Sequence, residues 1–224
     1  MPGAAVSPGD VSRQQVEAAF TALALLHQAW AAGESARGLC PGVQRRLEAY
    51  QEWDALLRTR RLESSVDDPF QILPVRAWGL LQAHAGKIPT KLRPWLDRVM
   101  PLQFCLCDVW HDHVLFEGDK VTGLVDYGGV KRDHVAVDLA RLLGSMVEDR
   151  ADLRTTGLEA YQRIRPLSLQ EEELVSVLDE TGTLVGLITW LKWLYVDGKH
   201  FDDRLAAAQR LRALVERIER WESY

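Results

Sequence analysis

The sequence has few cysteines, no lysine before Lys87 and no glycine-rich loop near its start. Its three cysteines are an odd number, and Cys105 and Cys107 lie inside an apolar run. This pattern favours reduced thiols over a disulfide framework, so we expect a cytoplasmic protein. The spacing of Cys105 and Cys107 is not that of a metal-ligand pair.

Charge argues against a nucleic-acid-binding protein, and hydropathy argues against a secreted or membrane-spanning one. The 27 basic and 32 acidic residues give a net charge of −5, and the arginines are scattered, so we expect no nucleic-acid partner. The start, MPGAAVSPGDVS, lacks the charged and apolar segments of a secretory signal. The longest apolar stretch, 183–196, contains Lys192 and is shorter than the roughly 20 residues of a membrane span. We expect a buried helix there and no membrane partner.

The 224 residues are 47% hydrophobic, which is enough for one substantial core. Helical spacing of apolar residues predicts helices on both sides of a central β element. The predicted helices span about 11–32, 42–62, 69–86, 90–100, 134–147, 150–163, 168–180, 182–196 and 203–222. Short Val-, Leu- and Phe-rich segments at 103–108 and 113–126 predict strands, with a hairpin turn at Glu117-Gly118-Asp119. The predicted fold is mainly α with a small central β-hairpin.

Two apolar runs in LCDVWHDHVLFEGDKVTGLVDYGG, residues 106–129, each end at an aspartate. Aspartates at strand ends often only cap turns. A hairpin between Val114 and Val125, however, would return Asp126 to the loop that holds Asp108. Paired carboxylates suit a magnesium–nucleotide site, because one can orient and deprotonate a hydroxyl while the other binds the cation.

The same stretch resembles the aminoglycoside phosphotransferase and choline kinase-like enzymes, whose fold is similar to that of protein kinases. Their signature is H-x-D-x-x-x-x-N, a hairpin, a strand ending in I-D-F or I-D-Y, and a D-L-A helix. CDVWHDHVLFEGDKVTGLVDYGG and VAVDLARLLGS follow that order here. The resemblance implies ATP and Mg²⁺ as cofactors and a small-molecule hydroxyl as acceptor. It also implies Asp108 as catalytic base, Asp126 as metal ligand, His113 as possible second ligand and Asp138 as support of the loop.

This chain departs from the family pattern at three points. Leu106 replaces the usual histidine, and His113 replaces asparagine, which would shift metal preference toward Mn²⁺ or another divalent ion because imidazole suits transition metals. No strand lysine or glycine-rich loop precedes the first helix. The resemblance therefore implies a kinase-like C-terminal lobe over 11–224, with 1–10 resembling the interlobe hinge and the N-terminal nucleotide lobe absent. The alternative function is an inactive kinase-like module that binds a small molecule or a protein partner.

Further candidates remain open on residue type alone. Trp190, Trp193 and Tyr195 could line a pocket for a cationic or sugar-like substrate, or could be helix core and rim residues. His111 and His113 form an H-x-H pair that could belong to a hydrolase metal site. No pattern in the sequence indicates a particular acceptor substrate or oligomeric state.

Overall fold

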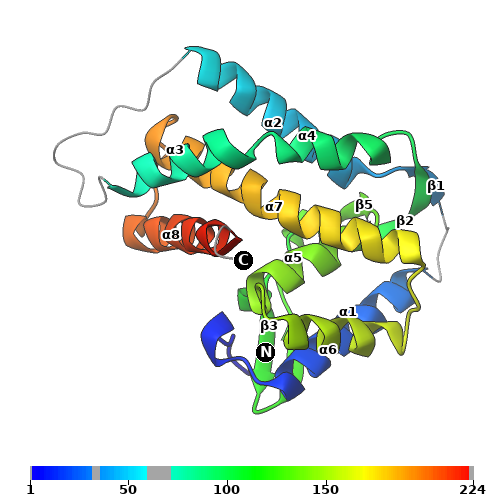
Figure 1. Ribbon diagram of the computed structural model, residues 1–224. Coiled ribbons are helices and arrows are strands. Elements are labelled where there is room, and N and C mark those ends of the chain that lie inside the picture. Colours follow the sequence, from blue (N-terminus) through cyan, green and yellow to red (C-terminus); the bar gives the residue numbers. More distant parts are fainter. Residues whose placement is uncertain (1, 32–35, 60–71, 222–224) are drawn as a thin grey trace. The chain divides into compact units, whose positions relative to one another are not determined.

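A computed structural model describes residues 2–31, 36–59 and 72–221 (Figure 1). The helices are α1 (Arg13–Ala31), α2 (Pro41–Thr59), α3 (Ile72–His84), α4 (Lys87–Leu92), α5 (Ala136–Met146), α6 (Ala151–Gln162), α7 (Leu169–Tyr195) and α8 (Arg204–Trp221). The strands are β1 (Ala36–Leu39), β2 (Val99–Cys105), β3 (Val114–Glu117), β4 (Lys120–Leu124) and β5 (Lys131–Asp133). Short 3-10 turns lie at Pro8–Asp10, Arg93–Trp95, His111–His113 and Tyr127–Gly129. The predicted fold class, mainly helical with a central hairpin, is confirmed.

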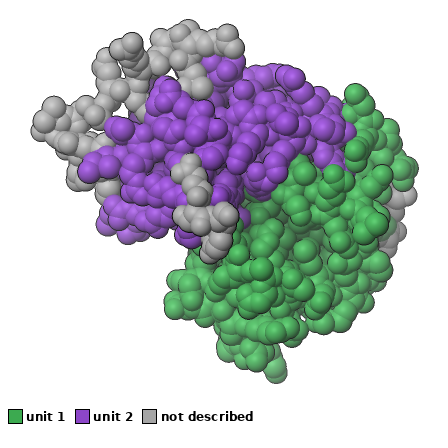
Figure 2. All heavy atoms as spheres, in the orientation of Figure 1, with its two compact units in different colours: residues 1–42, 97–179 green, residues 43–96, 180–224 purple. Residues whose placement is uncertain are grey.

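The chain divides into two compact units (Figure 2). Unit 1 comprises residues 1–42 and 97–179, and unit 2 comprises residues 43–96 and 180–224. All five strands lie in unit 1, together with α1, α5, α6 and the first part of α7. The aspartates predicted to form the site therefore all belong to unit 1.

Helix α1 begins with a reciprocal cap. The Ser12 hydroxyl accepts the Gln15 N–H at 3.1 Å, and the Gln15 side chain accepts the Ser12 N–H at 3.0 Å, so two N–H groups of the first turn are satisfied. Its buried residues recur at helical spacing: Val16, Ala19, Phe20, Leu23, Ala24 and His27. Helix α6 packs on this face, and Gly157 allows the approach because a Cβ there would lie 2.9 Å from a Phe20 ring carbon.

The predicted hairpin is present as β3 and β4, with Val114 opposite Leu124. Gly118 turns the chain with φ +59°, a conformation that costs glycine little because it has no Cβ. On its outer side the N-terminal segment adds one antiparallel bridge, in which Ala4 and Phe116 exchange both backbone hydrogen bonds. Residues 2–10 are thus part of unit 1, and their role as an interlobe hinge stays a prediction.

A three-stranded antiparallel sheet, ordered β1-β2-β5, was not predicted, although its central strand overlaps the strand predicted at 103–108. Its central strand begins at Val99, inside the segment predicted to be helical. Its outer strands, ARGL and KRD, are too short and too polar to show alternation, so only pairing with β2 defines them. This sheet ends at Cys105, where the loop with Asp108 begins.

Helix α7 is one continuous helix of 27 residues, where two helices were predicted. Gly182 lies inside it, and the buried neighbours Thr181 and Thr183 keep the helix packed through that point. Within the described ranges, α7 alone is long and apolar enough to cross a membrane by length and composition, and 56% of the tested window is buried. Buried core helices can have the same length and composition, so these properties of α7 are weak evidence for a membrane span.

Unit 2 is built from helices packed around aromatic and aliphatic side chains. Trp53 is fully buried and meets Trp78 edge to face, with ring centroids 5.0 Å apart. Its surface carries ion pairs between helices, including a two-pronged pair between Arg76 of α3 and Glu219 of α8. The unit contains none of the predicted catalytic or metal-binding aspartates.

Candidate active site

Asp108 lies in the loop between β2 and β3, and its side chain is 63% exposed. The residue before it, Cys107, has φ +63°, a left-handed conformation that is uncommon for residues other than glycine. Such a conformation persists only where surrounding contacts hold it, and it is found more often at functional sites than elsewhere. The loop therefore presents an accessible carboxylate on a constrained backbone.

The contacts that hold this backbone come from Asp138 of α5, which is fully buried. Its Oδ2 accepts the Leu106 N–H at 2.7 Å, and its Oδ1 accepts the Cys107 N–H at 2.6 Å. Asp138 thus satisfies two backbone donors on the residues directly before Asp108. This is the geometry expected of a loop support, the role that the sequence resemblance implies for Asp138.

Two buried side chains extend the network behind Asp138. His27 Nε2 lies 2.9 Å from Asp138 Oδ2, and His27 Nδ1 lies 2.8 Å from the Tyr161 hydroxyl. Because both Asp138 oxygens act as acceptors, Nε2 carries the proton, and Nδ1 then accepts from the Tyr161 O–H. Burial raises the pKa of Tyr161, which keeps that hydroxyl protonated. Helices α1, α5 and α6 therefore all support the Asp108 loop.

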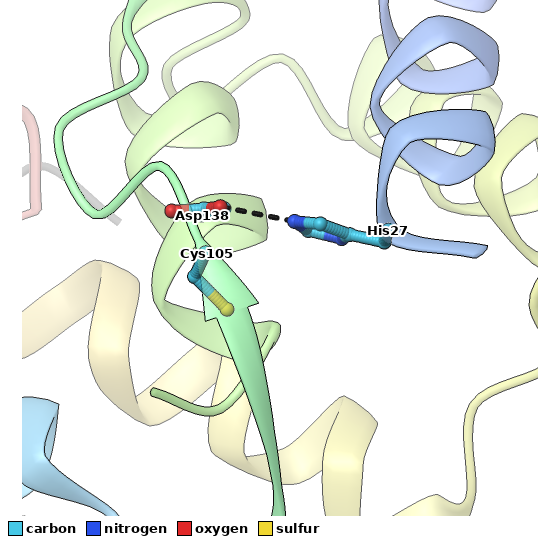
Figure 3. A group of neighbouring side chains, drawn as sticks. All are labelled: His27, Cys105 and Asp138. Carbon is cyan, nitrogen blue, oxygen red and sulfur yellow. Dashed lines mark hydrogen bonds and ion pairs between the residues drawn. The ribbon is translucent and has the colours of Figure 1, made fainter. Parts of the chain in front are cut away.

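A second reading of this buried cluster is a metal site, because His27, Cys105 and Asp138 bring ligand-type atoms within 4.8 Å of one another (Figure 3). Both nitrogens of His27 are already engaged. Burial, with the charge of Asp138, raises the pKa of the Cys105 thiol, whereas metals bind the thiolate. The three residues are therefore better explained as a hydrogen-bonded support than as a metal centre.

Asp126 follows the return strand β4 and adopts φ +61°. Its Oδ1 accepts the Gly128 N–H at 3.2 Å, and its side chain is 60% exposed. The turn after it touches the first loop: a Cβ on Gly129 would lie 2.7 Å from the Leu106 carbonyl oxygen and 3.3 Å from Asp108 Cβ. Only glycine fits there without a shift of the backbone. The hairpin thus brings the Asp126 turn against the Asp108 loop.

His113 is the last residue of the loop that carries Asp108, directly before β3. Its Nε2 lies 3.6 Å from Asp126 Oδ2, so the structure brings these two predicted metal ligands together. The same Nε2 is also 2.7 Å from the indole Nε1 of Trp110. The backbone reinforces the arrangement, because the His113 carbonyl accepts the Val125 N–H at 3.0 Å.

One face of α5 contacts this loop at three points. Asp138 binds the backbone before Asp108, Arg141 Nη2 lies 3.2 Å from Asp108 Oδ1, and the Ser145 hydroxyl accepts the His111 N–H at 3.1 Å. The spacing of 3 and 4 residues places all three side chains on one side of the helix. A rigid element therefore sets the position of the whole loop. Of the H-x-H pair, His111 Nε2 faces Asp112 at 3.3 Å, and among the described residues the group of possible metal-ligating side chains is His27, Cys105 and Asp138, without His111 or His113.

The predicted pocket aromatics belong to the part of α7 that lies in unit 2. Trp190 and Trp193 meet edge to face, with centroids 5.3 Å apart. The Lys199 ammonium lies 4.1 Å from the Trp193 ring centroid, and the Arg210 guanidinium 5.6 Å from that of Trp190. The faces of these two rings thus already contact cationic side chains of the same chain. A pocket lined by Trp190, Trp193 and Tyr195 stays a prediction.

Several residues of the site were not predicted from the sequence, namely His27, Trp110, Arg141, Ser145 and Tyr161. The one local signal was at His27, a polar residue on the apolar face of α1. Its partners Asp138 and Tyr161 lie 111 and 134 residues away, so no short pattern could join them.

The fold is kinase-like. Residues 1–173 match the model of the phosphotransferase enzyme family. The chain belongs to this family.

Several curated relatives of this chain are homoserine kinases. The enzyme of Methylobacterium sp. strain 4-46 is 33% identical over 186 residues, which are 68% of this chain and 58% of that protein. The enzyme of Agrobacterium fabrum is 32% identical over 117 residues, 46% of this chain and 36% of that protein. The chain thus spans about a third to three fifths of the length of these relatives.

The fold is shared with solved phosphotransferases. An aminoglycoside phosphotransferase from Alicyclobacillus acidocaldarius superposes with a TM-score of 0.61 at 17% identity, covering 98% of this chain and 67% of that one. A glucosamine kinase gives 0.59 at 15% identity, covering 100% of this chain and 60% of that one. At these identities the likeness supports the kinase-like fold and no particular substrate.

Proposed function

We propose that this chain carries the catalytic loop of a cytoplasmic, ATP-dependent kinase that phosphorylates a hydroxyl group of a small molecule. The observation that supports it most is the close approach of the turn after Asp126 to the loop that carries Asp108, at Gly129, while both carboxylates are exposed and Asp138 holds the backbone of the Asp108 loop. An accessible base and an accessible cation ligand on two loops that touch are what phosphoryl transfer needs from this part of a kinase.

In this proposal Asp108 would accept the proton that the acceptor hydroxyl loses as the hydroxyl oxygen takes the phosphoryl group from ATP, with ADP as the leaving group. Arg141, 3.2 Å from Asp108 Oδ1, orients the carboxylate. Asp126 presents Oδ2 to a divalent cation, while its Oδ1 is fixed by the Gly128 N–H. This donor fits Mg²⁺, which is commonly held by one or two carboxylates together with phosphate oxygens and water. When bound, ATP would supply the phosphoryl group and Mg²⁺ would neutralise its negative charge.

The first acceptor to test is homoserine, because the curated relatives are homoserine kinases at about a third identity. Glucosamine and an aminoglycoside serve as comparison acceptors. We expect turnover that depends on Mg²⁺ or Mn²⁺ and falls by at least about 100-fold in Asp108→Asn, because the variant keeps the shape of the side chain and loses the base.

The assay is run on this chain and on a version extended by any coding sequence in frame upstream of Met1. Binding of ATP is measured in parallel by calorimetry. If both versions turn over no acceptor and bind no nucleotide, the kinase proposal is wrong and the inactive binding module takes its place.

The metal role of Asp126 has its own test. We expect Asp126→Ala to weaken Mn²⁺ binding by at least about tenfold while leaving the circular dichroism spectrum and thermal unfolding nearly unchanged, because the side chain is mostly exposed. Unchanged Mn²⁺ affinity would remove Asp126 from the site.

A further inference from the structure

The contact between Trp110 and His113 follows from the local backbone. Residues 110–113 form a 3-10 turn in which the His113 N–H donates to the Trp110 carbonyl at 2.9 Å. Side chains three residues apart eclipse each other in such a turn. The two rings therefore meet, with centroids 5.6 Å apart and the indole Nε1 2.7 Å from His113 Nε2.

This contact fixes which nitrogen of His113 carries a proton. An indole N–H can only donate, so His113 Nε2 must be the acceptor and its lone pair must point at Trp110. In a neutral imidazole the proton then lies on Nδ1. A histidine nitrogen binds a metal ion through that same lone pair. While the Trp110 bond persists, Nε2 has no electron pair to offer a cation.

Without that bond, His113 and Asp126 would make a suitable pair of ligands for a transition metal. Their Nε2 and Oδ2 atoms are 3.6 Å apart. Two metal–ligand bonds of about 2.1 Å at a tetrahedral angle separate the ligand atoms by about 3.4 Å. Mixed nitrogen and oxygen sites bind Co²⁺, Ni²⁺ and Zn²⁺ more tightly than Mg²⁺ or Mn²⁺.

We propose that Trp110 determines the metal preference of this site by hydrogen-bonding His113 Nε2 and so keeping the imidazole out of the coordination shell. Asp126 is then left as a single oxygen ligand, which suits Mg²⁺ and gives no advantage to nitrogen-seeking ions. The inference rests on the proposed role of Asp126 as a metal ligand. It differs from the expectation that His113 is itself a second ligand.

The test measures Co²⁺ binding to the full chain by its visible absorption and Mn²⁺ binding by electron paramagnetic resonance. Trp110→Phe keeps a ring in place but removes the donor. We expect it to raise Co²⁺ affinity by about tenfold or more, the size typical of changes around ligating groups, while Mn²⁺ affinity stays within about threefold. The double variant Trp110→Phe/His113→Gln should return Co²⁺ affinity to the wild-type value. His113→Gln alone should change neither affinity by more than about threefold.

Two results would overturn the inference. One is a tenfold or larger loss of Co²⁺ or Mn²⁺ affinity in His113→Gln alone, because His113 would then already be a ligand. The other is no gain of Co²⁺ affinity in a folded Trp110→Phe variant.

A third measurement is independent of any metal and of that variant. Nitrogen-15 NMR of the metal-free wild-type chain should show His113 protonated at Nδ1 and unprotonated at Nε2, and the opposite tautomer would also overturn the inference. Failure of the proposed function is distinguishable, since it would appear as unchanged Mn²⁺ affinity in Asp126→Ala while the His113 tautomer remained as expected.

Discussion

At the scale of single residues, the position of the Asp108 loop depends on a buried carboxylate whose partners are all donors. Asp138 accepts two backbone N–H groups and the imidazole of His27, and its side chain is fully buried. Losing it would leave buried donors without partners, which costs far more than losing an exposed contact. Its importance therefore lies in holding the loop and not in contact with substrate.

We predict that Asp138→Ala lowers the free energy of unfolding by about 3 kcal/mol or more, because three buried or part-buried donors lose their acceptor at about 1–3 kcal/mol each. Arg141→Gln is the matched control on the same helix. The Arg141–Asp108 pair is about half exposed on each side, so its loss should cost less than about 1 kcal/mol. Urea unfolding of the three proteins measures both values, and equal losses in the two variants would contradict this account of the loop.

The sequence could predict Asp108, Asp126 and Asp138 as site residues because they lie in one short stretch with a recognisable order. The structure then adds their contacts. It could not predict that Gly129 must be glycine, since the reason is a carbonyl of residue 106 in the facing loop. Nor could it predict the proton on His113, which depends on the donor that a 3-10 turn places beside it.

At the scale of elements, helix α7 begins with a cap that also carries a buried charge. The Ser168 N–H and hydroxyl donate to Glu171 Oε2 at 2.9 and 3.0 Å, and the Glu171 N–H donates to the Ser168 hydroxyl at 3.3 Å. His134 Nδ1 accepts the Ala136 N–H, so its protonated Nε2 faces Glu171 Oε1 at 3.4 Å. Burial acts to raise the pKa of Glu171. The His134 ring, the Ser168 N–H and Arg165 outweigh burial and lower the pKa to about 2.

A carboxylate whose pKa is lower in the folded state stabilises the fold above its unfolded pKa, here 4.5, and loses that contribution as the pH falls to about 2. We predict that the wild-type chain loses about 1–2 kcal/mol more than Glu171→Gln between pH 5 and pH 2.5, because glutamine keeps the cap and lacks the charge. Urea unfolding across this range measures the difference. Parallel pH profiles for the two proteins would show that Glu171 carries no such linkage.

Whether helix α7 enters a lipid bilayer can be tested directly. Slightly more than half of its most apolar stretch, 56%, is buried, as expected of a helix that packs in the core of a protein. We predict that the chain stays at the bottom of a density gradient when mixed with phosphatidylcholine vesicles. Floating of the chain with the vesicles would mean that α7 enters the bilayer instead.

Predictability from the sequence also differs among elements. Long amphipathic helices such as α1 were predicted within two residues, because many side chains contribute to one period. Strands β1 and β5, with 4 and 3 residues, were missed since their pairing with β2 joins segments far apart in the chain. The two predicted halves of α7 are one helix because packing overrides the low helix propensity of Gly182.

At the scale of the whole molecule, the chain accounts for 67% of the Alicyclobacillus phosphotransferase and 60% of the glucosamine kinase. About a third of the first structure and two fifths of the second therefore have no counterpart in this chain. Nucleotide binding in kinase-like enzymes uses a strand lysine and a glycine-rich loop that covers the phosphates. The first lysine of this chain, Lys87, is the first residue of helix α4. Among the described strands, β4 and β5 carry lysines, and both strands are close in sequence to Asp126.

We predict that this chain by itself binds a divalent metal ion but binds ATP only weakly. It should bind Mn²⁺ in a manner that depends on Asp126, because the aspartate, its turn and the supporting loop are all present. It should bind ATP only weakly, with a Kd above about 1 mM, because one exposed carboxylate and its cation hold the phosphates without a covering loop. Calorimetry with ATP in the presence of Mg²⁺ measures this. A Kd in the micromolar range, lost in Asp126→Ala, would contradict the prediction and would mean that these 224 residues complete the nucleotide site by other contacts.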